Sequence, residues 1–398
     1  MVPVVLPVHH VQAPTTPRAF SCACGRPVFF NNSQCLACQR PLGYDAARGR
    51  LIALERVPLR GGKVGWREAG VPVRRAPRYA RCANLDTAAA CNWLLDGAEV
   101  QAGFTLCRCC RLTRTVPDLT QPNADVWWLR IEQAKRRLVS SLLGLKLPVQ
   151  AQAEVPDGLG LAFDLLLALP GGPAVVTGHA DGVITLDASE ADDARREERR
   201  GHLGETYRTL LGHLRHETGH YYWQLLVEPG EWLGPFRELF GDERQDYGAA
   251  LQKHYADGPP PDWGQRFVSA YASSHPWEDW AETWAHYLHL VDTLDTARSF
   301  GLDGERVELS YERFGMDVVA DSGDPQAADF LQLINSWMEL TGVLNELSRS
   351  MGVADFYPFV LSRPAVRKLH LVHRVVQSAA RAPAALAAGA AVEPLKAA

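Results

Sequence analysis

Apolar side chains recur at helical spacing along several stretches of this chain. Residues 125–145, 327–349 and 363–380 place their apolar positions on one face, at steps of three and four, and this pattern predicts amphipathic helices. Residues 205–214 show the same spacing. Residues 354–358 interrupt the last two patterns and are predicted to form a loop. The second half of the chain is therefore expected to be mainly helical.

Three short aliphatic and β-branched runs precede that helical half and predict strands at residues 163–169, 174–177 and 183–186. The sequence GHADG at 178–182 is predicted to form the turn between the last two. We expect residues 183–186 to form the edge of a sheet, where an extended peptide could pair with it; an ordinary core hairpin is the alternative. The predicted fold class is α+β, mainly helical.

The pentapeptide HETGH at residues 216–220 continues a helical pattern. Residues four apart lie on one face of a helix, so His216 and His220 can bind one divalent ion. Glu217 then points toward the place where a metal-bound water would lie. Gly219 weakens the helix, and a small residue is expected there if another backbone packs close to the metal. The motif is typical of a zinc hydrolase.

A catalytic zinc ion usually has three protein ligands and a water molecule. The third ligand is expected on the segment that begins at Pro276, because a polar stripe there is surrounded by tryptophan and aliphatic residues. The stripe consists of Glu278, Glu282, His286 and His289. We predict Glu278 as the ligand and Glu282 as a residue that supports the ligands; the alternative is a solvated helix face.

Other acidic residues compete for the role of third ligand. They are Asp242, Glu243 and Asp246. Their clustering is more typical of the start of a helix, where carboxylates cap free backbone N–H groups.

All nine cysteines lie before residue 111. The spacing CxC followed by CxxC is suited to one tetrahedral structural zinc ion. These residues are Cys22, Cys24, Cys35 and Cys38. Disulfides are disfavoured because the first twenty residues lack the basic start and apolar core of a secretory signal. The pattern predicts a zinc ribbon.

A second cysteine cluster has looser spacing. It comprises Cys82, Cys91, Cys107, Cys109 and Cys110. Cys107 and Cys110 form a CxxC pair, so we predict a second zinc site made by Cys82, Cys91, Cys107 and Cys110 with Cys109 as the spare. The alternative is a set of buried free thiols. Thiolate zinc sites imply a reducing compartment, so a cytoplasmic location is expected.

Three longer segments resemble the bacterial family of zinc-binding metallopeptidases that carry an N-terminal zinc ribbon. They are GHLRHETGHYYW (212–223), FGDERQDYGAALQKHYADGPP (240–260) and SAYASSHPWEDWAETWAHYLHLVDTLDTA (269–297). The likeness covers about residues 20–375. It also places the charged run at 190–200 among the family's motifs, although that run alone is typical of a solvated helix surface.

The layout of Tyr271, Glu278 and Glu282 resembles the lethal-factor-like peptidases of the gluzincin group. This resemblance implies a zincin-like catalytic domain in which His216, His220 and Glu278 bind zinc and Glu217 is the general base. It also implies that Tyr271 stabilises an oxyanion; His275 is the other candidate donor. Glu278 follows His220 by fifty-eight residues, a longer interval than in the compact gluzincins.

Charge is unevenly distributed. Sixteen Lys and Arg against seven Asp and Glu give the first 120 residues a charge of +9, whereas the whole chain carries −5 and the remainder therefore −14. The basic ribbon is expected to dock a peptide or protein substrate or to help folding, and nucleic-acid binding is the less favoured alternative. No apolar run is long enough to span a membrane.

Four regions are predicted: a disordered tail at 1–20, a zinc-ribbon region at 21–118, a zincin-like catalytic domain at 119–377 and an Ala-rich disordered tail at 378–398. The expected function is zinc-dependent peptide-bond hydrolysis, in which Glu217 activates a zinc-bound water. The alternative is a zinc-ribbon protein that binds protein or nucleic acid and carries a non-catalytic peptidase-like domain.

Overall fold

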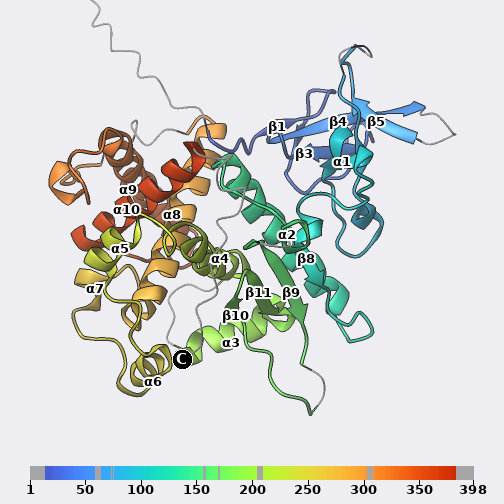
Figure 1. Ribbon diagram of the computed structural model, residues 1–398. Coiled ribbons are helices and arrows are strands. Elements are labelled where there is room, and N and C mark those ends of the chain that lie inside the picture. Colours follow the sequence, from blue (N-terminus) through green and yellow to red (C-terminus); the bar gives the residue numbers. More distant parts are fainter. Residues whose placement is uncertain are drawn as a thin grey trace, which may run out of the picture.

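The computed structural model describes residues 14–58, 64–72, 74, 76–155, 158–168, 171–203, 209–302, 307 and 309–381. A module of short strands forms the N-terminal part, and a larger part built around one sheet and several long helices follows it (Figure 1). The fold is thus α+β and mainly helical, as the sequence predicts.

The N-terminal module contains two two-stranded sheets and one three-stranded sheet, with β4 in the middle of the largest. Its hydrogen-bonded neighbours are antiparallel throughout. A one-turn helix, α1 (Gly97–Gln101), begins at a capping box made by Asp96 and Glu99. The strands are β1 (Phe20–Ser21), β2 (Pro27–Val28), β3 (Leu42–Asp45), β4 (Arg50–Pro58), β5 (Val64–Glu68), β6 (Ala80–Arg81) and β7 (Leu94–Leu95).

The segment ahead of β1 is packed against the helical part. Thr15 and Thr16 donate backbone hydrogen bonds to the carboxylate of Asp295, at 2.9 and 2.8 Å. The buried guanidinium of Arg18 donates to Asp292 at 2.8 Å. The prediction of a disordered tail is therefore wrong for residues 14–20, because these residues satisfy buried carboxylates; residues 1–13 lie outside the described residues.

A mixed four-stranded sheet belongs to the larger part, with the order β10-β11-β9-β8. The inner strands β11 and β9 are parallel, β8 is parallel to β9, and β10 is antiparallel to β11. Strand β8 falls within the range predicted for the zinc ribbon, so the chain enters this sheet before residue 118. The strands are β8 (Thr113–Thr115), β9 (Ala162–Leu166), β10 (Gly178–Ala180) and β11 (Val183–Asp187).

The hairpin formed by β10 and β11 differs from the sequence prediction. The strand lies at Gly178–Ala180 instead of 174–177, and the turn contains only Asp181 and Gly182. Both residues have positive φ, 47° and 80°, as a type I′ turn requires. The predicted edge strand, 183–186, lies inside the sheet, and β10 is at the edge instead.

The helices pack on one another around an apolar core. Three of the longest ones, α2, α9 and α10, agree closely with the predicted amphipathic stretches, and α10 continues past residue 378 to Arg381. Helix α8 begins at Pro276, as predicted for the segment with the polar stripe. Residues 204–208 at the start of the predicted 205–214 helix lie outside the described residues, and the helix begins at Leu210. The helices are α2 (Ala124–Gly144), α3 (Asp193–Leu203), α4 (Leu210–Leu226), α5 (Leu233–Phe240), α6 (Tyr247–Asp257), α7 (Trp263–Arg266), α8 (Pro276–Ser299), α9 (Ala327–Ser350) and α10 (Arg363–Arg381).

Helices α4 and α8 pack along each other, and Gly219 makes this possible. A Cβ at Gly219 would lie 2.8 Å from the Cα of Ala281 on α8. The indole of Trp280 donates a hydrogen bond to the backbone oxygen of Gly219 at 2.9 Å. The sequence expectation that another backbone approaches Gly219 is thus confirmed, and the close approach brings the polar faces of both helices together.

Candidate metal centre

The HETGH residues lie on α4, which begins where the side chain of Thr209 caps the helix by accepting from the N–H of Gly212. His216 and His220 are one turn apart and both are buried. Their ring centroids are 5.0 Å apart. Helix geometry therefore directs both imidazoles to one place, as the spacing predicts.

The carboxylate of Glu278 lies against both imidazoles. Helix α8 begins at Pro276 with His275 as its N-cap, and it places Glu278 in its first turn. Glu278 Oε2 is 3.0 Å from His216 Nε2, and Oε1 is 3.5 Å from His220 Nε2. One potential ligand atom from each residue lies within 4.8 Å of the others. The structure thus brings together the three residues predicted as ligands.

The chemistry of this cluster fits a divalent cation. Glu278 is only 1% exposed, yet its Oε2 accepts no hydrogen bond within the described part of the chain. Burial would raise the pKa of Glu278, but His220 and His216 more than offset that effect and the pKa is well below its usual value. A buried carboxylate that stays ionised beside two imidazoles is a ligand set suited to zinc.

Glu282 supports His216 from the side away from Glu278. His216 Nδ1 is 2.7 Å from Glu282 Oε1, and Ser269 Oγ donates to Glu282 Oε2 at 2.6 Å. Such a carboxylate–imidazole contact fixes the ring orientation and leaves Nε2 to face the metal. The contact agrees with the supporting role predicted for Glu282.

Two tyrosines lie beside the ligands. The ring of Tyr271, the predicted oxyanion donor, is 6.0 Å from that of His216, and its hydroxyl forms no hydrogen bond with the described residues. Tyr247, which the sequence analysis missed, donates a hydrogen bond from its hydroxyl to Glu278 Oε1 at 2.6 Å. Its presence in the FGDERQDYG segment, which carries part of the family resemblance, was the only sequence signal for it.

The other candidates lie elsewhere. His275 caps α8 through Nδ1, which accepts from Trp277 N at 3.1 Å, so its ring is engaged in the helix start. Asp242 and Glu243 form ion pairs with Arg244 and Arg237. Asp246 caps α6, as expected of a helix-start residue.

Glu217 faces a second pair of ionisable residues that the sequence analysis did not identify. His213 Nε2 is 3.4 Å from Glu217 Oε1, and His213 Nδ1 is 2.7 Å from Glu190 Oε2. Burial would raise the pKa of Glu217, but His213, His216 and His220 lower it, so the carboxylate is ionised and can accept a proton. Interpreting residues 190–200 as a solvated surface is wrong for Glu190, which is 3% exposed.

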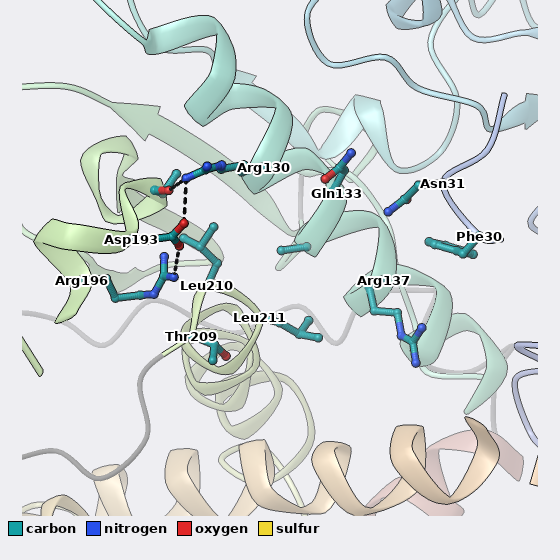
Figure 2. Close-up of a pocket in the computed structure, with 12 residues that line it drawn as sticks. Phe30, Asn31, Arg130, Gln133, Arg137, Asp193, Arg196, Thr209, Leu210 and Leu211 are labelled. Carbon is teal, nitrogen blue, oxygen red and sulfur yellow. Dashed lines mark hydrogen bonds and ion pairs between the residues drawn. The ribbon is translucent and has the colours of Figure 1, made fainter. Parts of the chain in front are cut away.

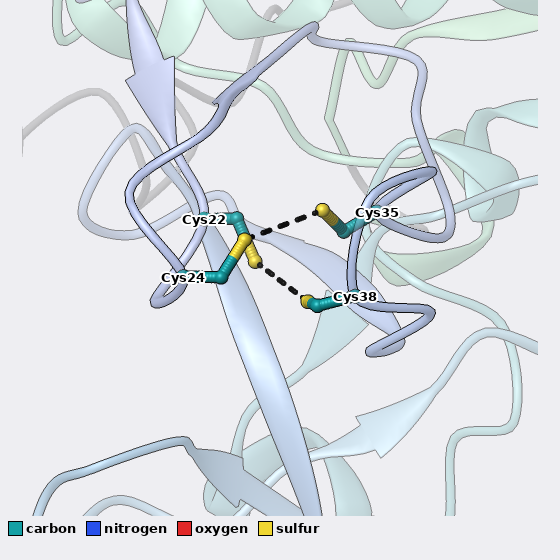
Figure 3. A group of neighbouring side chains, drawn as sticks. All are labelled: Cys22, Cys24, Cys35 and Cys38. Atoms are coloured by element: carbon teal, nitrogen blue, oxygen red, sulfur yellow. Dashed lines mark hydrogen bonds between the residues drawn. The ribbon is translucent and has the colours of Figure 1, made fainter.

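The first cysteine cluster converges in the N-terminal module (Figure 3). The sulfur atoms of Cys22 and Cys38 are 3.6 Å apart, and those of Cys24 and Cys35 are 3.8 Å apart. A hydrogen bond from the backbone N–H of Cys38, followed by one from Ala37, lowers the pKa of Cys35 to about 6. A thiolate is therefore present at neutral pH, as zinc binding requires.

The second cysteine cluster is fully buried and consists of Cys82, Cys91, Cys107 and Cys110. The sulfur atoms of Cys91 and Cys107 are 3.7 Å apart. Cys109 is buried as well but does not belong to this group. The structure thus assembles the four residues predicted as ligands and separates the one predicted as spare.

The buried Lys135 and Arg136 of α2 raise the local positive charge beside the second cluster. Lys135 forms an ion pair with Glu132 at 2.7 Å, and the charges of Cys109 and Cys110 also help to raise its pKa against the effect of burial. Four thiolates around one zinc ion carry a net charge of about −2, so these cations provide compensation.

A groove of about 500 Å³ lies where the N-terminal module meets the helical part (Figure 2). It is lined by Phe30 and Asn31 on one side and by α2 and the start of α4 on the other. Its arginines are engaged in ion pairs, Arg130 and Arg196 with Asp193 and Arg137 with Asp292. The groove lacks the residues of the metal centre and is a separate surface feature.

Among the described residues, every helix is too short or too polar to cross a membrane.

Comparison with known proteins identifies relatives of both parts. A family model described as "Putative zinc-binding metallo-peptidase" matches residues 124–375, and a model of a zinc-ribbon domain matches residues 19–121. An uncharacterized protein of Mycobacterium bovis is 41% identical over 365 residues, which cover 91% of this chain and 96% of that protein. Uncharacterized proteins of two Mycobacterium tuberculosis strains show the same identity and coverage. No solved structure matches the chain.

Proposed function

The chain belongs to a family of zinc-binding metallopeptidases with an N-terminal zinc ribbon, and from this premise we propose that it hydrolyses peptide bonds. The observation that carries the proposal is the convergence of His216, His220 and Glu278, with Glu217 on the same helix as the two imidazoles. A purely structural zinc site has four protein ligands, whereas these three would leave one position for a water molecule near Glu217.

We assign three zinc ions to the chain. His216, His220 and Glu278 would hold the catalytic one, and each cysteine cluster would hold one structural ion. Three protein ligands leave a coordination position for a water molecule, whereas four thiolates close the site. A zinc ion held by His216, His220 and Glu278 would supply the Lewis acidity that lowers the pKa of a water ligand to about 7.

In this proposal one residue transfers protons, another stabilises negative charge, and a third holds a ligand in place. Glu217 accepts the proton of the attacking water and then donates it to the leaving amine. The hydroxyl of Tyr271 donates a hydrogen bond to the developing oxyanion. The hydroxyl of Tyr247 donates a hydrogen bond to Glu278 Oε1. This bond keeps the third ligand in place.

The edge strand β10 is the natural place for the peptide backbone, because its outer side is not paired with another strand in the sheet. His179 on this strand lies near the ligands, with its ring 6.4 Å from that of His220. A cavity of about 500 Å³ is lined by β10, β11 and Arg114. An extended peptide paired with β10 would pass beside the metal centre.

Digestion of a peptide library by the purified protein tests the proposal. Glu217→Gln should retain zinc and lose about 10²- to 10⁴-fold in kcat, because it removes the general base and leaves the ligands intact. His220→Ala should lose both the labile zinc and turnover. Equal metal loss in the two variants would contradict the role of Glu217, and undetectable cleavage by the wild-type protein would contradict the proposed activity.

A further inference from the structure

We propose that His213 is a positioning residue for Glu217: anchored by Glu190, its ring holds one carboxylate oxygen of Glu217 so that the other can face the attacking water. This inference rests on the proposed function, in which Glu217 is the general base. It assigns a role to two residues that lie outside the metal ligand set, the half-buried His213 and the buried Glu190.

The geometry of α4 places His213 directly behind Glu217. The two residues are one helical turn apart, so their side chains share a face. The two ring nitrogens of His213 face different carboxylates, with Nδ1 2.7 Å from Glu190 Oε2 and Nε2 3.4 Å from Glu217 Oε1. With both nitrogens engaged in this way, His213 is a link between two carboxylates and not a metal ligand.

Glu190 is itself fixed in place. It lies in the short 3-10 helix Ala188–Ala191 that follows β11, and it is almost completely buried. Thr177 Oγ1 donates to Glu190 Oε1 at 3.1 Å, and the same hydroxyl accepts from the N–H of Asp187 at 3.1 Å. The sheet therefore determines where Glu190 lies, and Glu190 determines where the ring of His213 lies.

The charges of the three residues favour this arrangement. Burial would lower the pKa of His213, but Glu190 and Glu217 more than offset it and raise the pKa to about 9. The imidazolium then lies between two carboxylates, with a short charge-assisted hydrogen bond to Glu190 and a longer ion pair with Glu217.

Orientation matters because a glutamate side chain has several rotatable bonds, and a carboxylate that is held on one oxygen samples fewer rotamers. A displacement of about 1 Å in a reacting group can reduce the rate by about 10²-fold. The expected contribution of His213 is therefore to turnover and not to metal affinity.

A matched pair of variants separates the two ring nitrogens. The amide of Gln reaches the position of Nε2, and the amide of Asn reaches that of Nδ1. His213→Gln should keep a donor for Glu217 and lose no more than about 10-fold in kcat, whereas His213→Asn should lose about 10²-fold. Both variants should retain KM and the full zinc content. Equal kcat values for His213→Asn and His213→Gln would overturn the proposal, as would loss of zinc in step with kcat.

Crystal structures of the zinc-loaded wild type and both variants give a readout that does not depend on turnover. The Glu217 carboxylate should occupy one rotamer in the wild type and His213→Gln, and should be displaced or disordered in His213→Asn. An unmoved Glu217 in His213→Asn overturns the positioning role even if no substrate is cleaved. Absence of cleavage with Glu217 displaced as expected would count against the proposed peptidase activity alone.

Discussion

The cysteine clusters and the histidine–glutamate cluster are built in opposite ways. Each cysteine cluster gathers like side chains from the short segments that connect the strands and one-turn helices of the N-terminal module. The histidine–glutamate cluster gathers unlike side chains from α4 and α8, two long helices that pack on each other through Gly219. The first arrangement joins short segments through side chains of one kind, whereas the second lies on two long helices that pack directly on each other.

This difference indicates what each metal ion would do. Four thiolates around one zinc ion would close its coordination shell, and such a site would contribute binding free energy to the folding of the module. Helices with a well-packed core do not need that contribution, and their ligands can therefore leave one coordination position to solvent. In the second kind of site the buried carboxylate of Glu217 follows directly after the imidazole of His216 on α4.

The largest expected effect is in the cysteine region. Cys91→Ser should release one zinc ion and unfold the module, because structural zinc contributes about 10–16 kcal/mol of apparent binding free energy. Cys109→Ser is the matched control, since Cys109 is equally buried but lies outside the ligand group. Zinc content and limited proteolysis of residues 20–115 measure the outcome. Equal zinc content and equal protease resistance in Cys91→Ser and Cys109→Ser would contradict the role of Cys91 as a zinc ligand.

A smaller effect on the fold is expected from mild chelation. The protein should contain about three zinc ions per chain, and a competitive chelator should remove one of them without unfolding. Metal analysis and far-ultraviolet circular dichroism, recorded before and after chelation, test this. Two tightly held ions and none labile would instead favour a zinc-ribbon binding protein whose peptidase-like domain does not catalyse.

The smallest effect is expected at Glu282, which touches a ligand and not the ion. Glu282→Gln should weaken zinc affinity by about 10- to 100-fold, because it weakens the contact that orients His216. Glu243→Gln is the control, as Glu243 pairs with Arg237 away from the ligands. Competitive titration with a chromophoric chelator measures both affinities. Equal affinities in the two variants would show that helix packing alone orients His216.

The sequence errors share one physical cause. Glu190 belongs to a charged run that looks solvated, and its burial is favourable because distant residues contact its carboxylate, among them Thr177 and His213 of α4. The edge of the sheet was misplaced because strand order depends on pairing between distant segments, which periodicity does not contain. Arg18 seemed to lie in a tail for the same reason, since its partner Asp292 is far away along the chain.

What the sequence determined by itself was local. The four-residue spacing of His216 and His220 depends only on the helix that contains them, and the long helices follow from apolar periodicity. The tertiary structure decided everything that joins separate segments: the meeting of Glu278 with the imidazoles, the contact of Tyr247 with Glu278, and the link from Glu190 through His213 to Glu217. These contacts form because core packing brings α4, α8 and the sheet together. The periodicity of a sequence segment predicts only the element that the segment forms, and not which other elements pack against it.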